Sequence, residues 1–263
     1  MSALVASFGY HDVTDDPTSS GFQRRGAFPF KLGCRVFAEH LDRIAAAGRT
    51  PALAPEINLA IPGRHLLLTF DDGGRSAVHV GDALSRRGWK GHFFITTGLL
   101  GTRTFLTPGD VRRLRSQGHL IGSHSHSHPS IYRELDRGRM VVEWRQSCDI
   151  LAQLLGEPCL TASVPGGEIS PAVLRSADAA GVRYLFTSEP WLEPRIVGGC
   201  WVLGRFFAKS TTSADEIGQL ATFHGWTNRL MVRRLKALAR RSVPPLYRWY
   251  VKRSTREPQG VEQ

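Results

Sequence analysis

The sequence contains no long apolar run. No stretch approaches the roughly 18 uninterrupted apolar residues that are needed to span a bilayer. The first ten residues also lack a basic segment followed by a long apolar core, so they do not resemble a secretory signal peptide. We therefore expect a cytoplasmic protein, either free or held peripherally at the inner face of the membrane.

Cysteine is scarce and its spacing is uninformative. The four cysteines form no C-x-x-C pair and no other spacing typical of a metal site. Without a secretory context they are predicted to be separate reduced thiols. The chain also lacks internal repeats and low-complexity segments. Its 263 residues suit one α/β barrel or two small domains.

Acidic residues are absent from the segment 229–256, which holds ten arginines and lysines and supplies most of the formal net charge of +11. Its first half has apolar residues at helical spacing, namely Leu230, Met231, Leu235 and Leu238. This pattern predicts a basic amphipathic helix. Pro244 and Pro245 would end it, before an aromatic cluster at 246–250.

Two surroundings suit this basic segment. Positive charge beside aromatic residues favours peripheral contact with an anionic membrane, whereas an ordinary surface helix would pack its apolar side on the protein. Charge alone also permits nucleic-acid binding, but no recognised nucleic-acid motif accompanies it. We therefore predict a C-terminal helical extension over 211–263, packed on the rest of the chain or on a membrane. The oligomeric state is not readable from the sequence.

The main feature of the chain is an apolar run, 66–70, that stops at two adjacent carboxylates, Asp71 and Asp72, followed by Gly73 and Gly74. The run predicts a buried strand that ends in a turn. Acidic residues at the carboxyl end of a buried strand lie where α/β folds usually keep their chemistry. The simpler interpretation is a turn that Asp-Gly merely starts.

A second stretch, 121–129, carries three histidines within five residues. His124 and His128 are four apart, so on one helical turn they would share a face and could bind one metal ion, while His126 would point elsewhere. With one aspartate they form a ligand set that leaves a position open for water, as catalytic zinc sites do. The alternative is a solvated polar turn.

Together the two stretches resemble the NodB-homology polysaccharide deacetylases, which remove acetyl groups from N-acetylated sugars. Residues 69–73 match the family's Thr-Phe-Asp-Asp-Gly motif, and residues 124–129 match its His-Ser/Thr-x-x-His-x motif. The resemblance covers roughly residues 60–210. It implies that Asp71 is the general base and that Asp72, His124 and His128 bind a divalent metal, for which zinc is the first expectation and Co²⁺, Ni²⁺ or Fe²⁺ are alternatives.

The sequence departs from the family at two motifs. The third motif, Arg-x-Pro-x-Gly, reads Ser163 to Gly167 here, so its arginine is missing, although Pro165, Gly166 and Gly167 keep its turn and are expected to contact substrate. The last motif usually supplies a histidine as general acid, and Arg205 stands in its place. An arginine stays protonated and cannot readily donate a proton.

We therefore predict that Arg205 stabilises an oxyanion or holds the Asp71 carboxylate. His11 follows a predicted first strand, in a Tyr-His pair like that of several family branches, and is the candidate for the acid. The alternative is a homologue that binds metal and sugar but turns over poorly.

Helical and strand patterns alternate along the chain. Strands are predicted over 3–8, 66–70, 92–96, 119–123, 160–164, 184–187 and 201–206, and helices over 35–47, 76–88, 107–117, 137–155 and 170–181. This alternation favours parallel βαβ units. With the resemblance, it predicts an α/β fold, a distorted or incomplete (β/α) barrel of the NodB type over 1–210.

The predicted function is metal-dependent removal of N-acetyl groups from a glycan or a glycolipid precursor. The substrate would be an N-acetylated glycan or a lipid-linked sugar. Two rivals remain: hydrolysis of a different C–N bond on the same scaffold, and glycan binding without turnover. The sequence does not indicate which sugar, linkage or metal is used.

Overall fold

The computed structural model describes residues 3–242 and 253–255. Its described strands form one sheet in the order β7-β8-β6-β5-β4-β3-β2-β1-β9. All neighbours are parallel except β7, which runs antiparallel to β8. The strands are β1 (Leu4–Tyr10), β2 (Arg64–Phe70), β3 (His92–Ile95), β4 (Leu120–Ser123), β5 (Thr161–Ser163), β6 (Tyr184–Phe186), β7 (Arg195–Val197), β8 (Cys200–Leu203) and β9 (Phe206–Phe207).

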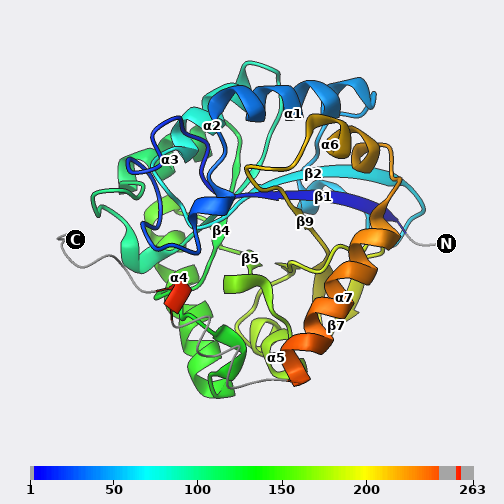
Figure 1. Cartoon of the computed structure of the whole chain (residues 1–263). Coiled ribbons are helices and arrows are strands. Elements are labelled where there is room, and N and C mark those ends of the chain that lie inside the picture. Colours follow the sequence, from blue (N-terminus) through cyan, green and yellow to red (C-terminus); the bar gives the residue numbers. More distant parts are fainter. Residues whose placement is uncertain (1–2, 243–252, 256–263) are drawn as a thin grey trace.

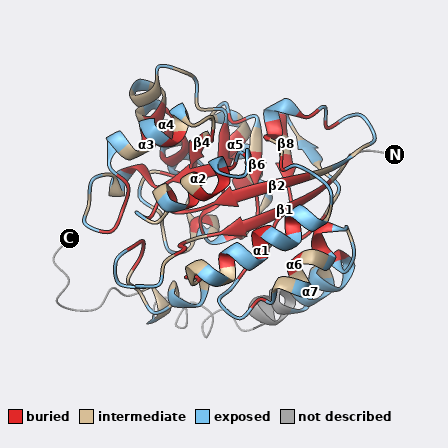
Figure 2. Cartoon of the chain, turned by 90° about the horizontal axis from the view of Figure 1, so that it is seen from above, coloured by how far each residue is buried: buried red, intermediate tan, exposed pale blue. Residues whose placement is uncertain are grey.

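Helices cover the outside of the curved sheet, with their exposed faces turned outward and the strands buried beneath them (Figures 1 and 2). They are α1 (Cys34–Ala46), α2 (Ala77–Ser85), α3 (Pro108–Ser116), α4 (Arg137–Leu155), α5 (Pro171–Ala179), α6 (Ala214–Ala221) and α7 (Trp226–Ser242). The alternation of strands and helices confirms the predicted incomplete barrel. Among the described helices, none is long and apolar enough to cross a membrane.

The chain crosses from one end of the open sheet to the other between β8 and β9. These strands are joined by only Gly204 and Arg205, yet β8 pairs with β6 and β9 pairs with β1. The predicted single strand 201–206 was therefore wrong. The strand is interrupted at Gly204 and Arg205, and its two parts pair with different neighbouring strands. The break needs glycine: a Cβ on Gly204 would lie 2.4 Å from the carbonyl oxygens of Glu189 and Trp191.

The alternation along β2 sorts its side chains between two layers. Leu66, Leu68 and Phe70 belong to the outer core under the helices, while Leu67 faces the inner cluster. Because neighbouring residues of a strand point to opposite faces, Thr69 shares the inner side with Leu67. The residue after Phe70, Asp71, is thereby directed toward the inside of the barrel.

The segment after residue 210 shares the core of the barrel. Ile217, Leu220 and Ala221 of α6 and Trp226 of α7 belong to the cluster that packs against β1 and α1. The division of the chain at residue 210 stays a prediction. Pro244, Pro245 and the predicted aromatic cluster (Leu246, Tyr247, Trp249 and Tyr250) lie outside the described residues.

Candidate active site

A cavity of about 560 Å³ opens at the carboxyl ends of the strands. Of the nine residues predicted from the sequence as catalytic, substrate-binding or metal-binding, eight line it, six of them with side chains: His11, Asp71, Asp72, His124, His128 and Arg205. Gly166 and Gly167 also line it, whereas Pro165 is buried outside the lining. The cavity is therefore lined by residues that follow β1, β2, β4, β5 and β8, together with residues of 24–30, 206–212 and α7.

The two adjacent carboxylates diverge because the chain turns sharply after Asp71. Asp72 has a φ of +74° and Gly73 a φ of +81°, so the strand ends in left-handed backbone. Such a conformation in a non-glycine residue costs free energy and is concentrated at functional sites. Gly74 is close-packed, since a Cβ there would lie 2.1 Å from Asp12 Oδ1.

Asp72, His124 and His128 each present one ligand atom, and these atoms all lie within 4.8 Å of one another. The Nε2 atoms of His124 and His128 lie 3.3 and 3.5 Å from Asp72 Oδ1. That oxygen is buried and has no hydrogen-bond partner among the described residues. A buried carboxylate oxygen without a donor, facing two imidazole nitrogens, fits a divalent cation such as zinc.

The histidine pair is not helical, so the reasoning from a shared helical face was wrong although the pair itself was found. His124 directly follows β4, and left-handed residues at Ser125 (φ +64°) and His128 (φ +51°) fold the loop back. His126 does not join the group, as predicted; its Nδ1 lies 3.1 Å from Thr97 Oγ1. An irregular loop has replaced the expected turn of helix.

The Nδ1 atoms of His124 and His128, on the far side of each ring from Asp72, also have partners in the protein. His124 Nδ1 donates to the carbonyl oxygen of Ser163 at 3.0 Å, which leaves a lone pair on Nε2. Burial lowers the pKa of His128 to about 4, against the opposing charge of Asp72, so this ring is neutral at pH 7. Arg24 Nη2 lies 3.3 Å from His128 Nδ1, so the Arg24 guanidinium faces the ring nitrogen that is turned away from Asp72.

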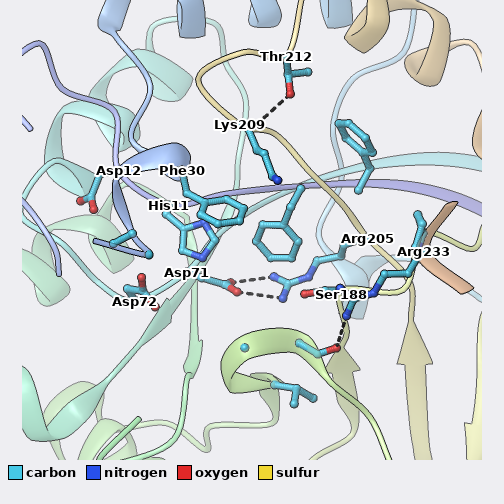
Figure 3. Close-up of a pocket in the computed structure, with 18 of the residues that line it drawn as sticks. His11, Asp12, Phe30, Asp71, Asp72, Ser188, Arg205, Lys209, Thr212 and Arg233 are labelled. Carbon is cyan, nitrogen blue, oxygen red and sulfur yellow. Dashed lines mark hydrogen bonds and ion pairs between the residues drawn. The ribbon is translucent and has the colours of Figure 1, made fainter. Parts of the chain in front are cut away.

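Asp71 is held by Arg205 in a two-pronged ion pair. Arg205 Nη1 lies 2.7 Å from Asp71 Oδ1, and Nη2 lies 2.9 Å from Oδ2 (Figure 3). The guanidinium is fully buried and also donates to the carbonyl of Thr187 and to Thr69 Oγ1. Burial raises the pKa of Asp71, but the charges of Arg205 and His124 outweigh it, so the pKa lies below its usual value.

Ser163 stands where the family motif has arginine, and it also contacts Asp71. Its hydroxyl donates to Asp71 Oδ1 at 3.1 Å from the end of β5. The cation that faces the base thus comes from position 205 rather than from position 163. Of the two roles predicted for Arg205, the geometry matches the one that holds the Asp71 carboxylate.

His11 lies in an aromatic slot at the side of the cavity. Its ring centroid is 4.9 Å from that of Phe30 and 5.1 Å from that of Phe207. Its Nδ1 atom is buried and has no hydrogen-bond partner among the described residues. Figure 3 shows the ring beside Asp71, with Asp72 on the same side of the cavity.

Sequence reasoning missed two acids that support the site. Asp12 is buried, lines the cavity and accepts from the hydroxyls of Ser20 and Ser76 at 2.5 and 3.0 Å. Burial raises the pKa of Asp12. Glu143 of α4 accepts from the backbone N–H groups of His126 and Ser127 at 3.0 and 2.8 Å, and so fixes the histidine loop. The sequence feature that could have pointed to Glu143 is its place beside the apolar side of the predicted helix 137–155.

Four basic residues of the cavity were also missed as site residues, namely Arg24, whose contact with His128 is given above, and three others. Lys209 follows β9, and Arg229 and Arg233 come from α7. Arg233 pairs with Glu189 at 3.0 Å, and Arg229 pairs with Glu216 at 2.7 Å. The basic character of α7 was visible in the sequence, but only the packing of α7 on the barrel turns it toward the cavity.

Comparison with known proteins shows what this chain is similar to. Residues 60–185 match the family model described as polysaccharide deacetylase. The peptidoglycan-N-acetylglucosamine deacetylase PgdA of Listeria monocytogenes is 39% identical over 82 residues, which is 30% of this chain and 17% of PgdA. A chitin deacetylase of Arthroderma benhamiae is 31% identical over 101 residues, which is 38% of this chain and 26% of that protein. The matches thus span only a minor part of these relatives.

Two solved structures share the architecture. The deacetylase PplD of Streptococcus pyogenes superposes with a TM-score of 0.71 and 18% identity, over 84% of this chain and 99% of that one. IcaB of Ammonifex degensii gives 0.70 and 20%, over 84% and 97%. At these identities the likeness concerns the fold. Over residues 60–185, which hold both intact motifs, this chain is similar to the polysaccharide deacetylases.

Proposed function

We propose that this protein is a metal-dependent hydrolase that removes the acetyl group from the nitrogen of an N-acetylated glycan or glycolipid precursor. The observation that carries the proposal is that a group of possible metal ligands and a separate ionised carboxylate line the same cavity. Asp72, His124 and His128 converge as possible metal ligands, and the ionised Asp71 lies beside them. Relatives named as deacetylases of N-acetylglucosamine units and of chitin support the choice of an N-acetylated sugar.

In this proposal Asp72, His124 and His128 hold one divalent cation, for which we propose zinc, while cobalt, nickel and iron(II) accept the same donors. When bound, the ion would supply Lewis acidity to the amide carbonyl and to a water molecule. The protein contributes the two imidazoles, the backbone carbonyl of Ser163 that orients His124, and Glu143 that fixes the loop.

Asp71 would act as the general base. A base must be ionised and within reach of the attacking water, and the pKa of Asp71 lies below its usual value. Arg205 orients both carboxylate oxygens and keeps them charged, but it donates no proton to the reaction. The proton that Asp71 accepts must later leave the carboxylate, so its pKa sets the lower pH limit of activity.

His11 would donate the proton to the leaving amine. Its ring borders the cavity near both carboxylates, and its buried Nδ1 has no protein partner among the described residues. A full kcat of His11→Ala across the pH range would exclude this role. Gly166 and Gly167 would form the opposite wall, where the absence of side chains lets a sugar ring approach the backbone.

The test is acetate release from short N-acetylglucosamine oligomers. The protein is stripped with chelator and then assayed with and without zinc or cobalt, beside an Asp71→Asn variant. We expect release that depends on metal and is lost in the variant. If the metal-loaded protein releases no acetate from a broad panel of N-acetylated sugars, the proposal is wrong. Oligomer binding without release would instead indicate a glycan-binding protein.

We also propose that α7 contacts an anionic membrane surface. Met231 and Leu235 are 55% and 67% exposed, and α7 is basic along its length. Basic charge next to exposed apolar residues is typical of interfacial helices. The protein should sediment with anionic liposomes at low salt and less at high salt; absence from those pellets would count against membrane contact.

A further inference from the structure

Lys209 is a cavity cation whose backbone is fixed. It follows β9, where Ala208 N–H donates to the carbonyl of Gly9 and Ser210 N–H donates to that of Pro29. Its own N–H donates to Thr212 Oγ1 at 2.9 Å. Figure 3 shows the amine projecting from this loop toward the Asp71–Arg205 pair. The charge is therefore presented to the cavity by an ordered loop.

Lys209 differs from Arg205, Arg229 and Arg233 because no acid of the described part of the chain forms an ion pair with it. Arg205 faces Asp71, Arg229 faces Glu216 and Arg233 faces Glu189. The Lys209 amine has no ion pair or side-chain hydrogen bond among the described residues. Its Nζ atom lies 5.4 Å from the centroid of the Phe30 ring. A positive charge left unpaired at a binding cavity attracts an anionic group of the ligand.

The wall formed by α7 adds an apolar strip to this charge. Val232 lines the cavity and is 47% exposed. Met231 and Leu235 lie within four residues of it on the helix and are more exposed still. Residues three and four apart lie on the same side of a helix, so the strip runs from the cavity along α7 toward solvent. Exposed apolar side chains in such a row are typical of a site that takes an apolar ligand.

We infer that the substrate is amphiphilic: an N-acetylated sugar joined through a phosphate to a lipid chain. The sugar occupies the cavity above Asp71, the phosphate contacts the Lys209 amine, and the lipid lies on Val232, Met231 and Leu235. A lysine amine binds phosphate as a point charge. This inference rests on the proposed deacetylase function and names its substrate class.

The test uses four substrates that vary phosphate and lipid independently. They are N-acetylglucosaminyl farnesyl phosphate, farnesyl N-acetylglucosaminide, N-acetylglucosamine 1-phosphate and methyl N-acetylglucosaminide. Acetate release gives kcat/KM for each with the wild-type protein, Lys209→Gln and the double variant Met231→Ser/Leu235→Ser. Lys90→Gln and Val142→Ser are matched controls, because Lys90 pairs with Glu56 on the surface and Val142 is 56% exposed on α4.

We expect the farnesyl phosphate to be the best substrate. Lys209→Gln should lower kcat/KM roughly tenfold for the two phosphates and leave the two neutral glycosides unchanged, since only a charge-assisted contact is lost. The double serine variant should lower it roughly tenfold for the two farnesyl compounds alone. Both control variants should behave as wild type with all four substrates.

Equal effects of Lys209→Gln on charged and neutral substrates would overturn the phosphate contact. A phosphate preference without a farnesyl preference would overturn the lipid part and leave sugar phosphates as substrates. If the wild-type protein hydrolyses none of the four and no oligomer, the proposed function has failed. The same compounds can then be titrated directly by calorimetry, and tighter binding of the farnesyl phosphate that is lost in Lys209→Gln would still uphold the inference.

Discussion

Replacing Arg205 by methionine is the most informative single change at this site. Methionine has a similar length and leaves the apolar contacts of the stem, but it removes the two hydrogen bonds to Asp71 at 2.7 and 2.9 Å. It also removes the donors to Thr187 and Thr69. The carboxylate of Asp71 is then buried without its cation.

The expected loss of stability is large and depends on pH. Removing one partner of a buried ion pair costs about 3–5 kcal/mol. In the wild-type protein the pKa of Asp71 is lowered, so its ionisation stabilises the fold above the unfolded pKa and this contribution is lost on acidification. In the variant the largest cause that opposes burial is gone, so burial raises the pKa of Asp71 above its wild-type position. The difference from wild type should therefore be greatest near pH 7 and shrink as the pH falls and Asp71 becomes protonated.

Urea denaturation at pH 7 and at pH 5 measures the stability, and acetate release between these pH values measures the activity. We expect the acid limb of the pH profile of kcat/KM to move to higher pH in Arg205→Met. It should move less in Arg205→Lys, because lysine keeps the positive charge but cannot make the two parallel hydrogen bonds of a guanidinium. Arg113→Met is the control, because Arg113 pairs with Asp82 on the surface and is 53% exposed. That variant should lose less than about 1 kcal/mol.

The reasoning would be refuted by an Arg205→Met protein that stays within about 1 kcal/mol of wild type at pH 7, since a buried pair is worth more than that. An acid limb of activity at the wild-type position would also contradict it. Either result would mean that the hydroxyl of Ser163, 3.1 Å from Asp71, suffices to keep that carboxylate ionised.

Three further predictions follow from the same contacts. The double variant Ser163→Arg/Arg205→His restores the family pattern and should be more stable in urea than Ser163→Arg alone. Position 163 is fully buried, so an added arginine needs the space that Arg205 vacates. An equal or lower stability of the double variant would contradict this. Burial lowers the pKa of His92 to about 4, so the unfolded chain binds the extra proton and unfolding free energy should fall by about 2 kcal/mol between pH 7 and pH 5, a slope that His92→Gln should reduce. His128→Ala should lose zinc in equilibrium dialysis, whereas His126→Ala, outside the ligand group, should keep it; loss in both would argue for a different ligand set.

The sequence by itself determined the local parts of the site. An apolar run that ends in two acids and two glycines forms a strand and a sharp turn wherever it packs, so Asp71 and Asp72 could be placed at a strand end. The same holds for the histidines after β4 and for the alternation of strands and helices that predicts the barrel. These features depend on residues close together in the chain, and local backbone preferences suffice to specify them.

Only the tertiary structure decided which side chains meet. Arg205 faces Asp71 because the chain changes partners at Gly204, where β8 and β9 bring the two ends of the sheet together. The histidines converge on Asp72 through left-handed residues and a distant glutamate, Glu143, not through a helical turn. Lys209 and the α7 residues reach the cavity because α6 and α7 pack on the core. Contacts between residues far apart in the chain depend on how the elements pack, and this packing cannot be predicted from patterns of neighbouring residues.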